Sequence, residues 1–410
     1  MANKYGRRPI YLFTTLLGFA SILGAAYAKT WAQLLVARVF NGFFPIAFAL
    51  GAVTVADLFF FHQRGRAMGI YTVTMVNGNH LAPIVGGLVG QYLGWRWIFK
   101  LAAIFDGVIL VTIFFCMPET LYVRHNKPRI NSNTRRGYIT KAIYMKGLRL
   151  WSTHPELKLR ANQFVLPSIK MARYPSVIFP AIYYATQYGF ASILPAVTVT
   201  VIFTEFFKWN TLDIGLGYGL ALTIGGSLGE LAAGWVVDYI VKRERRKLGG
   251  QDPEPEARLK AIWTGEILVP AGLLIYGFCL QYRTVWIAPL LGMGIAAFGV
   301  QVITTTIYTY TIDCYRPEGS EVAQLINFFR QEFGMTFAFY ALRLAERIGY
   351  QFTFLFFAIC GGVLAFIPIL GLMWKGREWR ERLGRPQNVN VFDSKLRGEV
   401  LDAEGFEVDR

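Results

Sequence analysis

The sequence predicts an all-α polytopic membrane protein. Of its 410 residues, 54% are hydrophobic and 16% are aromatic, which is more apolar than is usual for a soluble globular chain. Ten apolar runs are long enough to cross about 30 Å of hydrocarbon as helices. They lie at about residues 10–27, 31–56, 68–92, 98–117, 175–202, 213–240, 261–281, 286–311, 322–345 and 351–374.

The charged residues predict how the chain is oriented. The formal net charge is +16, but the lysines and arginines lie between the apolar runs and form no basic stripe, so nucleic-acid binding is not expected. If the spans alternate in direction, most of these charges fall on one side of the bilayer. The positive-inside rule then places both visible termini and the central polar segment in the cytoplasm.

The apolar runs and the polar segments between them predict four parts. An amino-terminal bundle of four spans occupies residues 1–120, and a carboxy-terminal bundle of six spans occupies residues 174–375. A basic cytoplasmic loop in residues 121–173 separates the bundles, and a cytoplasmic tail covers residues 376–410. Amphipathic patches near residues 139–151 are equally consistent with helices on the anionic inner leaflet and with a solvated linker.

The sequence contains no pattern for catalysis, metal binding or nucleotide binding. The four cysteines are isolated and the four histidines are scattered, so they form neither a disulfide framework nor a metal-ligand spacing. There is no G-x-x-x-x-G-K-S/T loop that would cradle a nucleotide. We therefore expect no catalytic residue, no metal and no cofactor, and neither an enzyme nor an ATP-driven pump.

Small residues recur every fourth position along the third span, at Gly78, Ala82, Gly86 and Gly90. On a helix they form a groove of small side chains that lets another helix approach closely. Pro83 lies inside this groove, where it removes an amide donor and frees the carbonyl group of Asn79 from its helical hydrogen bond. Substrate and proton binding are expected elsewhere, and the helix is expected to bend at a hinge formed by Gly78, Pro83, Gly86 and Gly87.

The two halves of the chain carry related segments. Residues 4–8 precede one span, and residues 234–243 form a looser echo of them in the second half. Four spans precede the central loop and six follow it. If the halves are repeats, as in many transporters, two spans are absent before Met1.

Six motifs occur in order along the chain, at residues 3–9, 38–42, 57–69, 78–87, 94–97 and 118–120. In order and spacing they resemble the motifs of the major facilitator superfamily, in its fungal-type twelve-span drug:proton antiporter branch, without the first two spans. Two positions depart from the family pattern, because Asn3 stands where an aspartate is usual and Ala82 replaces a glycine. The resemblance reaches to about residue 375 and implies a major facilitator fold with two pseudo-symmetric helical bundles.

The resemblance also implies a gate at the cytoplasmic ends of the helices. Charge contacts there would hold the inside closed in the outward-facing state, through Gly6, Arg7, Arg8, Arg64, Arg66, Asp238 and Arg243. Without the resemblance, the arginines among these residues are most plainly determinants of topology.

Polar side chains inside the first four spans are candidates for function, because a charge at the bilayer centre costs roughly 2.5 to 3.5 kcal/mol on insertion scales. Arg38, with Asn41 nearby, faces either the central cavity or an ion-pair partner on another helix. Asp106 is either a proton-binding acid or the partner of an arginine on another helix. His80 either relays protons or hydrogen-bonds to a freed carbonyl group.

The fifth and eighth spans correspond by resemblance to cavity-lining helices of the full fold, and their polar candidates are Tyr184, Gln187, Gln301 and Tyr308. Aromatic and amide groups suit amphiphilic organic molecules, because they offer stacking area and a few hydrogen bonds. Aromatic residues in spans also serve as packing or as interface belts. In the ninth span, either a structural polar network or a substrate contact is formed by Asn327, Arg330 and Glu332.

These observations predict a proton-coupled secondary transporter, and the resemblance implies that it lies in the plasma membrane. It would export small amphiphilic compounds by rocking two bundles around a midplane site, with protons as the coupling ion and the bilayer as its surroundings. Uptake of a nutrient or organic anion by the same fold is one alternative. A non-transporting, truncated membrane protein is another, because missing helices would leave a gap in the amino-terminal bundle, and this exact chain would then transport poorly.

Overall fold

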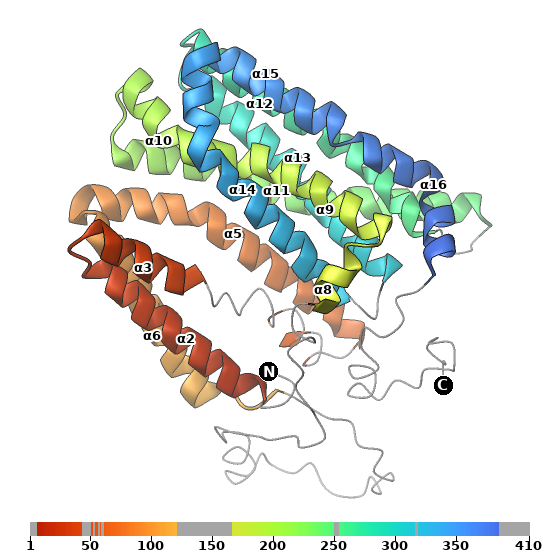
Figure 1. The fold of residues 1–410 in the computed structure, drawn as a ribbon, viewed down its shortest axis with the longest axis horizontal. Coiled ribbons are helices and arrows are strands. Elements are labelled where there is room, and N and C mark those ends of the chain that lie inside the picture. Colours follow the sequence, from red (N-terminus) through yellow and green to blue (C-terminus); the bar gives the residue numbers. More distant parts are fainter. Residues whose placement is uncertain are drawn as a thin grey trace, which may run out of the picture. The chain divides into compact units, whose positions relative to one another are not determined.

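The structure is a computed structural model that describes residues 6–42, 51, 54–55, 58, 61–120, 166–249, 254–315 and 319–384. These residues form helices joined by short connections, and there is no strand among them (Figure 1). Most of the predicted central loop, nearly all of the tail, Asn3 and the side chains of Arg64 and Arg66 lie outside the described residues. Where they are described, the ten predicted runs lie almost entirely in helices, apart from a turn at residues 365–366 and single residues at the ends of three runs, which confirms the predicted fold class.

Seven helical segments in the described ranges are long and apolar enough to cross a membrane. Several are longer than the apolar runs, because charged residues extend them at one end. The segments are Arg7–Ala26, Trp95–Cys116, Pro175–Phe207, Thr211–Lys247, Pro255–Gln281, Ile287–Cys314 and Tyr350–Leu383.

By their contacts, the helices divide between two compact units. The first unit contains α2 (Arg7–Ala26), α3 (Trp31–Gly42) and α6 (Trp95–Cys116). The second contains the Thr72–Tyr92 portion of α5 (Phe61–Leu93) together with every described helix from residue 166 onward. The small-residue stretch of the third span therefore packs with the helices of the carboxy-terminal half.

The helices of the first unit begin at positions that the local sequence favours. Gly6 and Gly94 directly precede α2 and α6 with φ angles of 93° and 84°, a backbone conformation that glycine adopts without strain. Before α3, Gln33 Oε1 accepts the amide N–H of Thr30 at 3.4 Å, and Thr30 Oγ1 accepts the amide N–H of Gln33 at the same distance. This reciprocal pair is a capping box, which satisfies two amide groups that the helix leaves without partners.

The second unit consists of long helices, two of which contain a wider π-helical turn. Residues 175–207 run through such a turn, and so do residues 350–383. In chain order the elements are α8 (Leu166–Met171), α9 (Pro175–Tyr188), η2 (Gly189–Ile193), α10 (Leu194–Phe207), α11 (Thr211–Lys247), η3 (Pro255–Ala261), α12 (Ile262–Gln281), α13 (Ile287–Cys314), α14 (Gly319–Ile348), α15 (Tyr350–Ile359), η5 (Cys360–Leu364) and α16 (Ile367–Leu383).

Glycines allow α11, α12 and α13 to pack backbone against backbone. A Cβ atom on Gly272 would lie 2.5 Å from the carbonyl oxygen of Gly292, and one on Gly225 would lie 2.2 Å from that of Gly294. No other residue fits at these positions unless a helix moves. The three helices therefore form the rigid centre of the unit, because small residues are what permit such close contact between spans.

The small-residue stretch of α5 uses the same kind of contact against α11. A Cβ atom on Gly87 would lie 2.8 Å from Gly215 Cα, and one on Gly215 would lie 2.6 Å from the carbonyl oxygen of Pro83. A Cβ atom on Gly86 or Gly78 would meet nothing within 4 Å. Of the four residues predicted to form a hinge, Pro83 and Gly87 lie in the contact with α11, and Gly78 and Gly86 do not.

His80 packs in the same contact. A Cβ atom on Gly226 of α11 would lie 2.4 Å from the imidazole Cε1 atom. The imidazole is buried, and its Nδ1 atom has no hydrogen-bond partner within the described ranges. The two expectations for His80, a proton relay and a hydrogen bond to a freed carbonyl group, remain predictions.

Replacing Gly87 with alanine is expected to lower the thermal unfolding temperature of the purified chain. The added methyl group meets the backbone of α11, and overpacking of this kind costs about 1 to 3 kcal/mol. Gly86→Ala is the matched control, because it adds the same methyl group one residue away in open space. Equal unfolding temperatures for the two variants would show that the helices are not in contact at Gly87.

Candidate functional site

A buried arginine in the second unit lies among three tyrosines. The guanidinium carbon of Arg330, on α14, is 4.5 Å from the ring centroid of Tyr188 on α9. The Tyr184 ring lies 5.8 Å from Tyr188 and 5.7 Å from Tyr308 of α13. We call Arg330, Tyr184, Tyr188 and Tyr308 the arginine cage. It joins three helices that are far apart in the sequence.

No acid among the described residues neutralises the charge of the arginine cage. Only 8% of Arg330 is exposed. Among the described side chains, those that interact electrostatically with its guanidinium are the phenols of Tyr184, Tyr188 and Tyr308, and none is a carboxylate. Its Nε–H group has no hydrogen-bond partner within the described residues. Because arginine stays protonated in proteins, the cage holds a positive charge and a free donor.

Such a cage can bind an organic anion with an aromatic or apolar body. The tyrosine rings provide stacking surface, and the guanidinium provides donors that match a carboxylate or sulfonate group. A cation against an aromatic face contributes about 2 kcal/mol when it is desolvated. The arrangement is therefore suited to ligands that combine one acidic group with apolar surface.

A second polar contact joins α11 to α13. The amide Nε2 of Gln301 donates to Glu230 Oε2 at 3.2 Å. Gln301 is buried and Glu230 is half-buried. Glu230 is thus hydrogen-bonded to a glutamine and is not among the groups that interact with Arg330.

A third polar group surrounds Glu266 of α12. Its Oε2 atom accepts hydrogen bonds from the Tyr183 hydroxyl group and, at 3.1 Å, from the Gln187 amide. The same Gln187 nitrogen donates to the carbonyl oxygen of Gly361 in η5 at 3.2 Å. We call Tyr183, Gln187 and Glu266 the glutamate cluster.

Helical spacing explains why α9 contributes residues to both the arginine cage and the glutamate cluster. Tyr183 and Gln187 are four residues apart and share one face, and Tyr184 and Tyr188 share the adjacent face. The predicted candidates Tyr184 and Gln187 therefore belong to different polar groups. Tyr183, Tyr188 and Glu266 were not among the predicted site candidates, although the four-residue spacing and an acid inside an apolar span were available signals.

The other two candidates of the ninth span, Asn327 and Glu332, are more exposed than Arg330. Asn327 is half-buried on α14, one turn before Arg330. Glu332 is exposed, two residues beyond Arg330, and so points away from the arginine cage.

The predicted candidates of the first unit lie on α3 and α6. The guanidinium carbon of Arg38, an exposed residue of α3, lies 5.3 Å from the ring centroid of Phe99 in α6. Asn41 is half-buried near the end of α3. Asp106 is half-buried on α6, and its Oδ2 atom lies 3.8 Å from where a Cβ atom on Gly18 would stand. Among the described residues, neither Arg38 nor Asp106 forms an ion pair.

The residues predicted to form the gate are placed in two different environments. Arg7 and Arg8 are buried at the start of α2, where Glu119 accepts their amide N–H groups at 2.9 and 3.3 Å. Arg8 Nη2 also donates to the carbonyl oxygen of Phe114 at 2.6 Å. These contacts bind the beginning of the first span to the end of α6, in the motif segment that contains Glu119.

The gate residues of α11 lie on its surface. Asp238 and Arg243 are both exposed. The described part of the chain contains no ion pair between them. A gate role for them remains a prediction.

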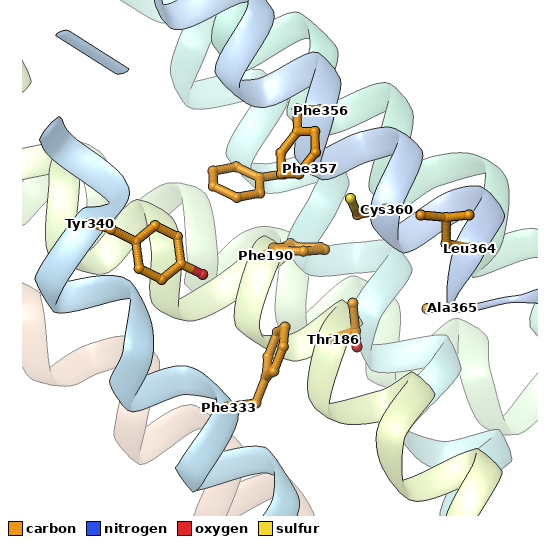
Figure 2. A pocket seen from close by; sticks show the side chains of 9 residues that line it. All are labelled: Thr186, Phe190, Phe333, Tyr340, Phe356, Phe357, Cys360, Leu364 and Ala365. Carbon is orange, nitrogen blue, oxygen red and sulfur yellow. The ribbon is translucent and has the colours of Figure 1, made fainter. Parts of the chain in front are cut away.

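An apolar pocket of about 590 Å³ lies beside α9, between α14 and α15. Figure 2 shows Phe190 and Phe333 on its walls, with the Tyr340 hydroxyl group pointing into it. Its lining contains no charged residue and consists of Thr186, Phe190, Phe333, Tyr340, Phe356, Phe357, Cys360, Leu364 and Ala365. A space with this lining suits an acyl chain or the apolar part of an amphiphile.

Replacing Glu119 with alanine is expected to destabilise the chain by about 1 kcal/mol, because the carboxylate caps the first turn of α2. The measurement is the thermal unfolding temperature in detergent. Glu346→Ala is the matched control, since Glu346 is exposed on α14. An unchanged unfolding temperature for Glu119→Ala would show that this contact does not hold the helix start.

Comparison with known proteins identifies the family. Residues 1–339 match the sequence model of the Major Facilitator Superfamily. The efflux pump radE of Floropilus chiversii is 30% identical over 356 residues, which are 85% of this chain and 64% of radE. The probable efflux pump mfs2 of Aspergillus flavus is 26% identical over 398 residues, which are 95% of this chain and 90% of mfs2.

The fold is that of solved transporters in the same superfamily. It is similar to the xylose transporter XylE from E. coli, with a TM-score of 0.60 and 15% identity, over 91% of this chain and 81% of XylE. The chain spans about two thirds of the length of radE. The predicted fold is confirmed, and so is the expectation of a membrane transporter rather than an enzyme. The chain belongs to the major facilitator superfamily.

Proposed function

We propose that the chain exports small amphiphilic organic compounds in exchange for protons, as a member of the fungal twelve-span drug:proton antiporter branch. The observation that carries the proposal is the arginine cage, with its unneutralised guanidinium among three tyrosine rings. The efflux pumps radE and mfs2, which the chain resembles over most of its length, support export as the direction.

The chemistry of the arginine cage narrows the substrate class. Taking an organic anion into the bilayer is costly unless its charge is paired. The guanidinium of Arg330 is a pairing partner that is already desolvated, and the rings of Tyr184, Tyr188 and Tyr308 cover apolar surface. A compound with both an aromatic body and an acidic or acceptor group gains from both features. A small, wholly polar solute gains only from the guanidinium and not from the tyrosine rings.

Proton coupling requires an acid that exchanges its proton during the transport cycle. Asp106 is the candidate in the first unit, because it is half-buried inside a span and has no cationic partner among the described residues. Alternating access would then expose substrate and proton sites to each side in turn. We place the transporter in the plasma membrane with both visible termini in the cytoplasm.

Uptake of an organic anion together with protons is a second candidate function. The unneutralised charge of Arg330 favours it, because such a site attracts anions from either side of the membrane. The two candidates share the binding chemistry and differ in the direction of net flux.

Replacing Arg330 with methionine is expected to weaken the binding of naphthalene sulfonate, an aromatic anion, at least tenfold. A tenfold loss corresponds to about 1.4 kcal/mol. Isothermal titration calorimetry on the purified chain measures this affinity. Arg283→Met is the matched control, because Arg283 is exposed and lies 5.1 Å from the centroid of the Phe206 ring, outside the arginine cage. Equal affinities for the two variants would remove Arg330 from the binding site.

Export is tested with cells that express the chain and are loaded with rhodamine B, an amphiphilic dye. We expect these cells to retain less dye than cells expressing Arg330→Met, and an uncoupler to abolish the difference. Increased accumulation that collapses with the uncoupler would support uptake instead. Retention equal to that of cells without the chain would contradict transport in either direction and favour a non-transporting protein.

A further inference from the structure

We propose that Glu266 is a proton-binding site of the second unit, where gain or loss of one proton rearranges the hydrogen bonds between α9, α12 and η5. Proton binding at Glu266 is independent of the direction of transport. Its link to substrate movement rests on the proposed export function.

Glu266 is buried, and one of its two carboxyl oxygens has no described hydrogen-bond partner. The residue is 6% exposed, and both of its described donors, Tyr183 and Gln187, are completely buried. Both donors are directed at the same oxygen, Oε2. The other oxygen, Oε1, is buried and has no hydrogen-bond partner within the described residues. A structural carboxylate would be expected to use both oxygens.

No described cation balances a negative charge on Glu266. From α9 it faces Tyr183 and Gln187, and from η5 it faces Gly362. The neighbouring residue Gly265 packs on the backbone of Gly299 and the apolar side chain of Ile303 in α13. A buried carboxylate without a cation is expensive, because its lost hydration is not replaced by an ion pair. Binding a proton removes that charge.

The acid Glu256 of η3, the element that directly precedes α12, is paired elsewhere. Glu256 of η3 forms an ion pair with Arg380 of α16 at 3.1 Å. The ring centroid of Phe366, the residue before α16, lies 5.9 Å from that of Tyr183. The charged groups at this end of the unit are thus paired with each other and not with Glu266.

A proton held on Oε2 changes the hydrogen bonds in the glutamate cluster. A protonated carboxyl oxygen donates, whereas both present partners of Oε2 are donors. The proton comes from water, and once it is held on Oε2 an acceptor has to turn towards it. Either the Tyr183 hydroxyl group rotates or the Gln187 amide turns over. The Gln187 Oε1 atom is buried and without a described partner, so it is available as that acceptor.

Turning the Gln187 amide over would release Gly361, because the same Nε2 atom now donates to the Gly361 carbonyl oxygen. Gly361 belongs to the π-helical turn η5, and the π-helical turn η2 begins two residues after Gln187. A Cβ atom on Gly361 would lie 3.1 Å from the ring of Phe190 in η2. The two turns are therefore in contact, and π-helical turns are often found at functional sites.

The same helix connects the glutamate cluster to the arginine cage. Tyr183 and Gln187 of the cluster alternate along α9 with Tyr184 and Tyr188 of the cage. A change in the position of α9 on proton binding therefore moves two tyrosines of the cage. By linkage, a ligand that fixes those tyrosines must also change the affinity of Glu266 for its proton.

The test of proton binding is infrared difference spectroscopy of the purified full chain during a pH titration. The expected result is a protonated-carboxyl band that disappears as the pH rises and is missing from Glu266→Gln. Asp106→Asn is the control that retains the Glu266 band. Tyr183→Phe, a second variant, is expected to shift the frequency of the band, because the carboxyl group loses a hydrogen bond. An unchanged carboxyl spectrum in Glu266→Gln would overturn the proposal.

The link to the arginine cage is measured by calorimetry with naphthalene sulfonate, whose charge does not vary with pH. Titrations in buffers with different ionisation enthalpies report how many protons are exchanged on binding. We expect the wild-type chain to exchange protons and Glu266→Gln to bind the probe without exchange. If the wild-type chain exchanges no protons on binding, the proposed link between the glutamate cluster and the arginine cage is contradicted. Loss of dye export with an intact Glu266 band would instead refute the export function alone.

Discussion

The second unit depends on one region of α13, which touches the backbones of two other helices. A Cβ atom on Gly229 of α11 would lie 2.6 Å from the carbonyl oxygen of Phe298, and one on Gly265 of α12 would lie 2.6 Å from that of Gly299. Each of these glycines directly precedes a glutamate, Glu230 or Glu266. The close contacts therefore fix the depth and rotation at which both acids stand. In an apolar bundle this matters, because a polar group that misses its partner has no water to replace it.

The arrangement separates two kinds of chemistry on one helix. One face of α9 contributes Tyr184 and Tyr188 to a positively charged, aromatic environment, while the adjacent face contributes Tyr183 and Gln187 to a carboxyl group. Because both pairs are fixed to the same rigid helix, neither environment can shift without the other. A transporter needs this kind of shared element if two solutes are to bias one conformational equilibrium.

Local sequence patterns predicted a large part of the fold. Features that depend on contacts between distant parts of the chain could not be predicted from them. Hydrophobic length located the helices in the described part of the chain, and the small residues around Pro83 predicted a close helix contact. The pattern could not show that Gly87, rather than Gly86, meets α11, since that depends on how another helix is rotated. Burial of Arg7 and Arg8 was missed for the same reason, because Glu119 lies more than a hundred residues further along the chain.

The π-helical turn η2 has a consequence for the register of its span. A turn of this kind holds one residue more than the α-helical turn it replaces, and each residue advances a helix by about 100°. The faces of α10 are therefore rotated relative to those of α9, although the two form a single span. Heptad or helical-wheel drawings made across residues 189–193 place α10 on the wrong side. A related protein that lacks one residue there would turn a different set of side chains towards α11 while keeping the same tyrosines on α9.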